Sequence, residues 1–300
     1  MQGKIIKQIS NDYTVKTKDK EYICKPRGKF RKLQTNPLVG DEVIIDEKNN
    51  YILEILPRKN FLHRPSIANI DNAIIITSLK SPDFDTNLLD KLLVVITYNN
   101  IKPIIIFTKS DLLTKKELND FEKYFNYYKK IGIECFMNYE LDNIKKIFKN
   151  KVSVFTGQSG AGKSTLLNNL DKSLNIKTAE ISLALNRGKH TTRHTSLLEI
   201  NGGLVADTPG FSALSFNDMT NDLIRDNFIE FNKYRNNCKY KDCMHHKEDD
   251  CEIKRKLKEN EILQSRYDNY INFITKRWFY ECRRIIFKNS RSKWKNKTFR

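Results

Sequence analysis

Residues 157–164 have the composition and spacing of a phosphate-binding loop. They read Gly157, Gln158, Ser159, Gly160, Ala161, Gly162, Lys163 and Ser164. An apolar segment, 152–155, precedes them, and a helical pattern over 163–170 follows. Glycines let successive N–H groups surround a phosphate, and the helix N-terminus adds its positive end. We expect Lys163 to bridge the β- and γ-phosphates, Ser164 to ligate Mg²⁺ and Thr165 to donate to the α-phosphate.

A second motif, at residues 108–111, follows the apolar strand expected over 103–107. It reads Thr108, Lys109, Ser110 and Asp111, and is similar to the guanine-reading Asn-Lys-x-Asp motif with Thr in the first place. The Asp111 carboxylate can accept from both N1–H and the 2-amino group of guanine, a pair of donors that adenine lacks. Lys109 would lie along the base plane. The two motifs together predict a GTP/GDP site at the carboxyl ends of parallel strands.

A third motif, at residues 207–210, reads Asp207, Thr208, Pro209 and Gly210. Asp207 is expected to hold Mg²⁺ through water, and the Gly210 N–H to sense the γ-phosphate. Phe211 follows, at the place where many GTPases carry a water-orienting Gln. Slow intrinsic hydrolysis is therefore expected, with a catalytic group supplied from elsewhere.

The segment 187–192 lies where a mobile first switch belongs. Thr192, or less favourably Thr191, is the candidate for a second Mg²⁺ ligand. His190 is the candidate for positioning or deprotonating water, and the alternative is an exposed loop histidine. With Lys163 and Asp207, these residues form the predicted catalytic set.

A cysteine and histidine cluster lies in the C-terminal third. Cys238, Cys243 and Cys251, with His245 or the adjacent His246, provide three thiolates and one imidazole within 14 residues. Four such ligands close a tetrahedral Zn²⁺ shell, so one structural zinc ion per chain is predicted. The other three cysteines are scattered along the chain, which favours a reducing cytosol over a disulfide framework.

The elements around these motifs predict three parts. Residues 1–62 contain five short strands, at 4–9, 13–17, 22–26, 42–45 and 51–56, which suggest a small barrel of the OB type. The connection 27–40 places basic residues around Phe30. It could grip a phosphate backbone and stack a base, or be only a solvated loop.

From residue 69 onward, strands alternate with helices. Strands are expected at 73–77, 103–107 and 152–155, helices at 87–97, 118–130 and 163–170, and a hairpin at 196–206 around Asn201 and Gly202. This order predicts a mostly parallel, doubly wound α/β sheet. Beyond residue 216 the chain reads as helical, with one apolar stripe from Leu263 to Trp278 interpreted as core, and a frayed basic tail at 289–300.

Charge points to a polyanionic partner. The chain holds 54 Lys and Arg against 36 Asp and Glu, a net charge of +18, and residues 251–300 alone hold 15 against 5. A general bias toward lysine is the alternative explanation. With neither a signal peptide nor a run of roughly 18 apolar residues, a cytoplasmic protein with no membrane association is expected.

The base motif at 108–111 precedes the phosphate loop at 157–164, whereas ordinary GTPases begin with the phosphate loop and reach the base motif last. This order, the 187–192 segment and the cysteine cluster together resemble the small-ribosomal-subunit-dependent GTPases of the RsgA type. The resemblance implies an OB barrel over 1–62, a circularly permuted GTPase domain over 63–216 and a zinc-bearing helical domain over 217–300. It also favours His245 over His246. The chain departs from the family at Thr108, at residues 249–250, where the usual Pro-Gly is Asp-Asp, and near 135–138, which lacks a Ser-Ala base-contacting motif.

The resemblance implies a monomeric GTPase that binds the 30S subunit and its 16S rRNA, assists late maturation and hydrolyses GTP faster when bound there. Two alternatives remain. One is an rRNA-binding module with vestigial hydrolysis, against which Lys163, Ser164 and Asp207 argue. The other is a P-loop ATPase or small-molecule kinase, which the guanine-reading Asp111 would exclude.

Overall fold

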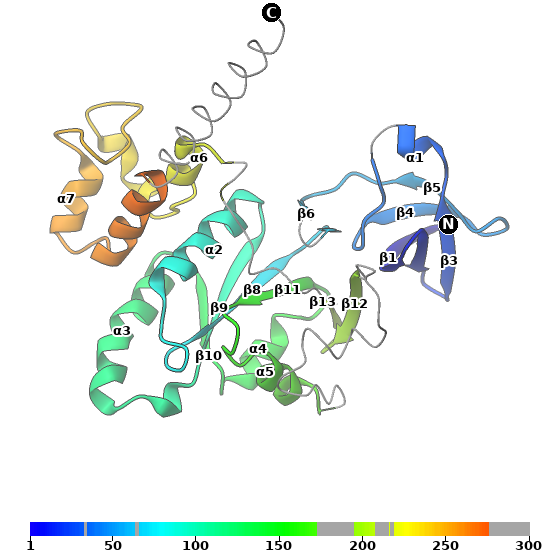
Figure 1. Cartoon of the computed structure of the whole chain (residues 1–300), viewed down its shortest axis with the longest axis horizontal. Coiled ribbons are helices and arrows are strands. Elements are labelled where there is room, and N and C mark those ends of the chain that lie inside the picture. The colour runs from blue at the N-terminus through cyan, green and yellow to red at the C-terminus, as the bar shows by residue number, and fades with distance from the viewer. Residues whose placement is uncertain (33–34, 64–65, 173–194, 208–215, 217–218, 276–300) are drawn as a thin grey trace, which may run out of the picture. The chain divides into compact units, whose positions relative to one another are not determined.

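The computed structural model describes residues 1–32, 35–63, 66–172, 195–207, 216 and 219–275. The chain folds as two units. The first comprises residues 1–85 and 95–214, and the second comprises residues 86–94 and 215–300. Figure 1 shows their helices and strands. In the described part of the chain, no helix combines the length and apolar character needed to cross a membrane.

The first unit begins with a closed barrel. Its strands are β1 (Gln2–Ile9), β2 (Asp12–Lys16), β3 (Glu21–Pro26), β4 (Glu42–Asp46) and β5 (Tyr51–Ile55). They pair in the order β1-β2-β3-β5-β4, and β4 returns to β1 to close the ring. Alternate side chains point inward, so that Ile5, Val15, Val43 and Ile52 are fully buried. The predicted OB-type barrel is confirmed, with each strand end within two residues of its expected place.

The remainder of the first unit is built on a mainly parallel sheet. Its strands are β8 (Asn72–Ser78), β9 (Lys102–Thr108), β10 (Glu134–Met137), β11 (Val152–Gly157), β12 (Thr195–Ile200) and β13 (Gly203–Asp207). They run in the order β10-β9-β8-β11-β13-β12, with β12 antiparallel to β13. Every residue of β8 is buried, as expected for a central parallel strand. The predicted α/β class is therefore confirmed.

Helices connect these strands. They are α2 (Thr86–Tyr98), α3 (Lys115–Lys130), α4 (Leu141–Lys146) and α5 (Lys163–Leu170). Thr114 begins α3 with a reciprocal capping box, in which its hydroxyl accepts from the Glu117 N–H and the Glu117 carboxylate accepts from the Thr114 N–H. The buried rings of Phe107 and Phe121 pack edge to face, with centroids 4.8 Å apart, and fix α3 against β9.

Short elements complete the first unit. They are α1 (Lys29–Lys32), the β6 (Phe61–His63) and β7 (Ser66–Ala68) hairpin, and the 3-10 turn η1 (Ser110–Leu112). Asn201 and Gly202 both have positive φ, at 49° and 72°, as the predicted tight hairpin between β12 and β13 requires.

The second unit consists of small helices. They are α6 (Asn221–Asp226), the 3-10 turns η4 (Phe231–Lys233) and η5 (Arg235–Asn237), α7 (Glu252–Lys258) and a helix over 264–275. The first nine residues of α2 pack in this unit. Phe228, Phe231 and Tyr270 are buried at its centre, with ring centroids 5.1–5.2 Å apart. Within the apolar stripe, Tyr270 and Ile274 are buried as the core interpretation predicts, whereas its other described members are only partly buried: Leu263, Tyr267 and Ile271. Trp278 and the tail lie outside the described residues.

Candidate functional site

The parallel strands bring the phosphate loop (residues 157–164) and the base motif (residues 108–111) to one edge of the sheet. Gly157 ends β11 and pairs with Ile76 of β8, while Thr108 ends β9 and pairs with Ser78 of β8. Because all three strands run the same way, their carboxyl ends open on the same side, where α/β sheets bind ligands.

The phosphate loop begins at a position that only glycine can occupy. Gly157 has φ of 131°, and a Cβ there would lie 2.0 Å from the Ile76 carbonyl oxygen. Lys163 Nζ points back into the loop and donates to the carbonyls of Gly157 and Gln158, at 3.1 and 2.9 Å. Burial lowers the pKa of Lys163. Ser164 is buried at the start of α5, and Thr165 is exposed beside it.

The base motif is bonded directly to the phosphate loop. The buried Thr108 hydroxyl donates to the Ala161 carbonyl at 2.7 Å, and Lys109 Nζ donates to the Gly160 carbonyl at 2.8 Å. Lys109 also donates to the carbonyl of Ser81, in the connection that follows β8. The Thr108 hydroxyl therefore links the two motifs, at the position where the Asn-Lys-x-Asp motif carries the side-chain amide of an asparagine.

Asp111 lies in η1 with its side chain exposed, where its carboxylate is accessible to a base. The turn that follows β10 lies next to the base motif, in the region near 135–138 where the sequence lacks a Ser-Ala base-contacting motif. The Asn138 N–H donates to the Phe107 carbonyl at 2.9 Å, which holds this turn next to the base motif. The Glu140 carboxylate accepts from the Met137 N–H at 2.7 Å, and the Tyr139 side chain is 69% exposed.

Asn138 and Tyr139 thus occupy the place next to the base motif where the family resemblance led us to expect a Ser-Ala motif that contacts the base. Glu134–Met137 has no polar–apolar alternation, and four residues were too few to identify a strand from the sequence.

Several predicted site residues lie outside the described residues. They are the switch residues His190, Thr191 and Thr192, and Gly210, the predicted γ-phosphate sensor. Asp207 ends β13, which pairs in parallel with β11, so its backbone reaches the same edge as the phosphate loop.

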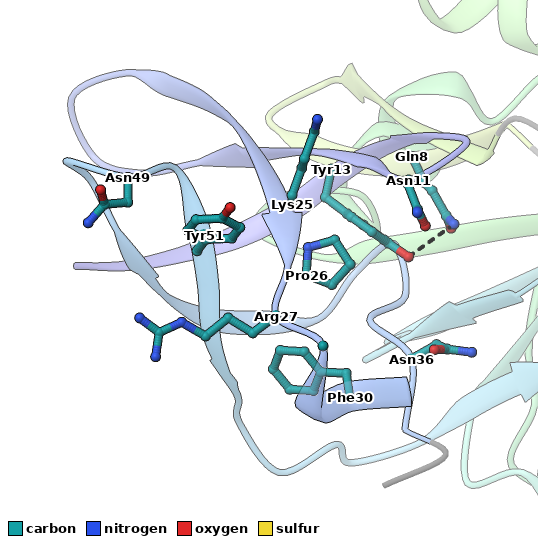
Figure 2. A pocket seen from close by; sticks show the side chains of 11 residues that line it. Gln8, Asn11, Tyr13, Lys25, Pro26, Arg27, Phe30, Asn36, Asn49 and Tyr51 are labelled. Atoms are coloured by element: carbon teal, nitrogen blue, oxygen red, sulfur yellow. Dashed lines mark hydrogen bonds between the residues drawn. The ribbon is translucent and has the colours of Figure 1, made fainter. Parts of the chain in front are cut away.

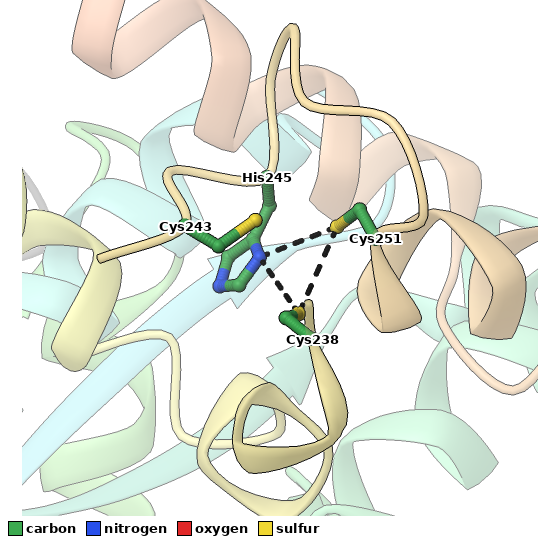
Figure 3. Close-up of side chains that lie close together, drawn as sticks. All are labelled: Cys238, Cys243, His245 and Cys251. Carbon is green, nitrogen blue, oxygen red and sulfur yellow. Dashed lines mark hydrogen bonds between the residues drawn. The ribbon is translucent and has the colours of Figure 1, made fainter. Parts of the chain in front are cut away.

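The second unit holds the cysteine and histidine cluster, which we call the Cys₃His cluster: Cys238, Cys243, His245 and Cys251. Its four ligand atoms all lie within 4.8 Å of one another (Figure 3). His245 Nδ1 is 3.6 Å from Cys238 Sγ and 3.4 Å from Cys251 Sγ, and these two sulfur atoms are 4.0 Å apart. A tetrahedral zinc site with Zn–S of about 2.3 Å and Zn–N of about 2.0 Å needs ligand separations of about 3.5–3.8 Å. The geometry therefore fits zinc.

Burial favours the uncharged forms of Cys243 and His245. Burial, with the neighbouring Cys251 and Cys238 thiols, raises the pKa of Cys243 to about 12. Burial, with the Arg225 charge, lowers the pKa of His245 to about 4. Both pKa shifts favour the uncharged form of the side chain when no ion is bound. A bound divalent ion would instead stabilise the thiolate form of the cysteines.

Backbone contacts settle which histidine joins the cluster. Tyr267 donates its hydroxyl to the His245 carbonyl at 2.7 Å, and the Glu248 carboxylate accepts from the backbone N–H of His246 at 2.9 Å. His245 is 1% exposed and turned inward, and His246 is not among the clustered ligands. Asp250 has φ of 52°, so it takes the left-handed conformation at the position where the family resemblance led us to expect glycine.

Comparison with known proteins agrees with this arrangement. The RsgA GTPase family matches residues 55–217, and the RsgA N-terminal domain matches residues 2–52. The small ribosomal subunit biogenesis GTPase RsgA 2 of Oceanobacillus iheyensis is 47% identical over 281 residues, which are 91% of this chain and 96% of that protein. The corresponding RsgA of Enterococcus faecalis is 42% identical over 294 residues, which are 96% and 98% of the two chains.

Two solved structures share the fold. YloQ, described as a circularly permuted GTPase, aligns with a TM-score of 0.78 at 37% identity, covering 92% of this chain and 94% of that one. YjeQ from Thermotoga maritima aligns with a TM-score of 0.79 at 31% identity, covering 92% and 97%.

The order of the motifs, the closed barrel before them and the Cys₃His cluster after them are now explained together. The protein is a GTP hydrolase whose base motif precedes its phosphate loop in the chain. It belongs to the RsgA family of circularly permuted GTPases.

Proposed function

We propose that this GTPase binds the small ribosomal subunit, assists its late maturation and hydrolyses GTP faster when bound. The names of its relatives support the ribosomal role. The observation that carries the nucleotide assignment is the bond from Thr108 to Ala161, which joins a guanine-reading motif to a phosphate loop.

Within this proposal the nucleotide is held by residues 108–111 and 157–165, with Gly210 at the γ-phosphate. Asp111 reads the guanine edge, and Lys163 neutralises the charge that develops on the phosphates. Ser164 and Thr192 would ligate Mg²⁺, and Asp207 would hold it through water. We propose His190 as the group that positions the attacking water once the subunit has docked.

We also propose a structural role for zinc in the Cys₃His cluster. All four ligands come from the protein, so no position is left for a substrate, and the metal would stabilise the fold of a small helical unit. With this assignment, residues 1–62 form the barrel domain, 63–216 the GTPase domain and 217–300 the zinc domain. The net charge of +18 supports contact with 16S rRNA phosphates. We propose that the protein acts there as a cytoplasmic monomer.

The test is phosphate release from GTP with and without purified 30S subunits. We expect turnover to rise by orders of magnitude with subunits, as for other GTPases that gain an external catalytic group. Equal turnover in both conditions would refute the ribosomal mechanism.

Base reading is tested with Asp111→Asn. This variant should prefer xanthosine triphosphate over GTP, because an amide complements the xanthine edge. Unchanged preference for GTP would exclude Asp111 as the base reader. Asp120→Asn makes the same change at an exposed position on α3, outside the base motif, and serves as the matched control.

A further inference from the structure

A cavity of about 850 Å³ opens at one end of the barrel, well away along the chain from the GTPase motifs (Figure 2). Its lining includes three aromatic, four amide and two basic side chains, and none of the described residues that line it is acidic. Its size falls within the range of small-ligand pockets, and its composition is that of a nucleotide site rather than an apolar one.

One aromatic side chain in this cavity is available for stacking. Tyr51, at the start of β5, is 41% exposed, whereas Phe30 and Tyr13 are 5% and 3% exposed. The connection 27–40 had suggested Phe30 as a stacking ring, but Phe30 packs into the barrel and forms part of the cavity wall. Figure 2 shows Tyr51 between Asn49 and Lys25.

Two cations lie beside Tyr51. Lys25 is its register partner across the parallel β3–β5 pair, and Arg27 follows at the end of β3. Both side chains are exposed, and neither forms an ion pair with another described residue. Asp46, at the end of β4, accepts from Asn49 Nδ2 at 2.9 Å and from two backbone N–H groups, and these bonds lower its pKa. The Arg27 charge adds a weaker contribution to this shift without forming an ion pair with Asp46. The cations are therefore available to a phosphate.

The side-chain amides that line the cavity can accept hydrogen bonds from a ligand through their oxygen atoms. Because Asn49 Nδ2 is bonded to Asp46, its carbonyl oxygen remains for a ligand. Gln8 Nε2 likewise donates to the Tyr13 hydroxyl at 3.1 Å and to the Ser10 carbonyl, which leaves its oxygen available. Amide oxygens accept from the amino and imino N–H groups on the Watson–Crick edge of a nucleobase, and this edge is free only when the base is unpaired.

We propose that this cavity binds one unpaired RNA nucleotide, with its base stacked on Tyr51 and its phosphate between Lys25 and Arg27. The inference rests on the proposed ribosomal function and adds that the barrel recognises an extruded or single-stranded base. A duplex would offer the phosphates but neither a free ring face nor a free Watson–Crick edge, so the cavity discriminates against paired RNA.

The experiment measures binding of the full-length protein to a short single-stranded RNA and to the duplex formed with its complement. Tyr51→Ala should bind the single strand about tenfold more weakly, the effect of losing one base–aromatic stack. Tyr51→Phe should bind as the wild type does, because it keeps the ring. Ile23→Ala is the matched control, since Ile23 is 67% exposed on the barrel outside the cavity.

The phosphate contact is tested through salt dependence. Lys25→Gln and Arg27→Gln should each reduce the slope of log affinity against log salt by about 0.7, the contribution of one phosphate contact to a single strand. Lys18→Gln removes the same charge from another barrel turn and should leave the slope unchanged.

Two results would overturn the inference: Tyr51→Ala binding the single strand as tightly as wild type, or losing affinity for the duplex to the same extent. These failures are distinct from failure of the proposed function. If 30S subunits do not stimulate the wild-type GTPase, the ribosomal role fails. If they stimulate it but Tyr51→Ala retains full affinity for RNA, only the nucleotide pocket fails.

Discussion

Arg266 and Asp90 form a buried ion pair, with Nη1 2.8 Å from Oδ1, although they are 176 positions apart in the chain. Both side chains are at most 1% exposed. Glu230 binds the other edge of the guanidinium through two bonds of 2.7 Å, and Asn269 Nδ2 donates to Asp90 Oδ2 at 2.7 Å. This group ties the start of α2 to the helices around the Cys₃His cluster.

Arg266→Met should destabilise the second unit by about 3–5 kcal/mol, because it leaves two carboxylates buried without a cation. Chemical denaturation followed by tyrosine and tryptophan fluorescence measures this change. The control is Lys239→Ala, since Lys239 pairs with Asp250 at the surface, where the two side chains are 57% and 71% exposed; it should change stability by less than about 1 kcal/mol. Equal effects at the two positions would contradict the assignment.

Thr108→Val should weaken GDP binding by about tenfold, because it leaves the Ala161 carbonyl of the phosphate loop without its buried donor. Thr108→Ser keeps the hydroxyl and should bind nearly as the wild type does. A fluorescent GDP analogue provides the measurement. Wild-type affinity in Thr108→Val would show that the link between the motifs does not organise the site.

Cys238→Ser should remove the metal and destabilise the second unit, because a closed zinc site joins Cys238, which follows η5, to Cys251, which precedes α7. Metal analysis should find one zinc per wild-type chain and none in this variant, and circular dichroism should show lost helix. His246→Ala should keep its zinc, while His245→Ala should lose it. The reverse pattern would mean that the wrong histidine was assigned.

Glu117 makes the start of α3 sensitive to acid. Hydrogen bonds from the Thr114 backbone, Lys80 and the Thr114 hydroxyl lower its pKa from 4.5 to about 2. A carboxylate with a depressed folded-state pKa stabilises the protein above its unfolded pKa and loses that effect as pH falls toward 2. Glu117→Gln should therefore differ most from wild type above about pH 5, with the two denaturation midpoints converging in acid. A constant difference would argue against the capping box.

The sequence alone predicted the elements that repeat a clear pattern. Barrel strands with alternating side chains, the buried strands β8 and β9 and the loop before α5 were all identifiable, since each carries its own periodicity or motif. The clustering of Cys238 to Cys251 within a short segment likewise made the metal ligands visible without tertiary structure.

Features that depend on distant contacts could not be predicted. Nothing near Arg266 indicates that Asp90 is its partner, because their proximity is created only by folding. Tyr51 and Phe30 looked alike in the sequence, and only the barrel decides which ring is buried. The position of the turn at Asn138 and Tyr139 beside the base motif was not predicted, because residues 135–138 lack the Ser-Ala motif and β10 is four residues long.

The strand order has a consequence for synthesis of the protein. In the finished sheet β11 lies between β8 and β13, yet it is made after β8, β9 and β10. The chain leaves the ribosome from its N-terminus. Strands β8, β9 and β10, which position the base motif, can therefore pair before β11 has taken its place beside β8. Insertion of β11 then delivers the phosphate loop to a base motif already in place, so nucleotide can stabilise this unit only late in translation.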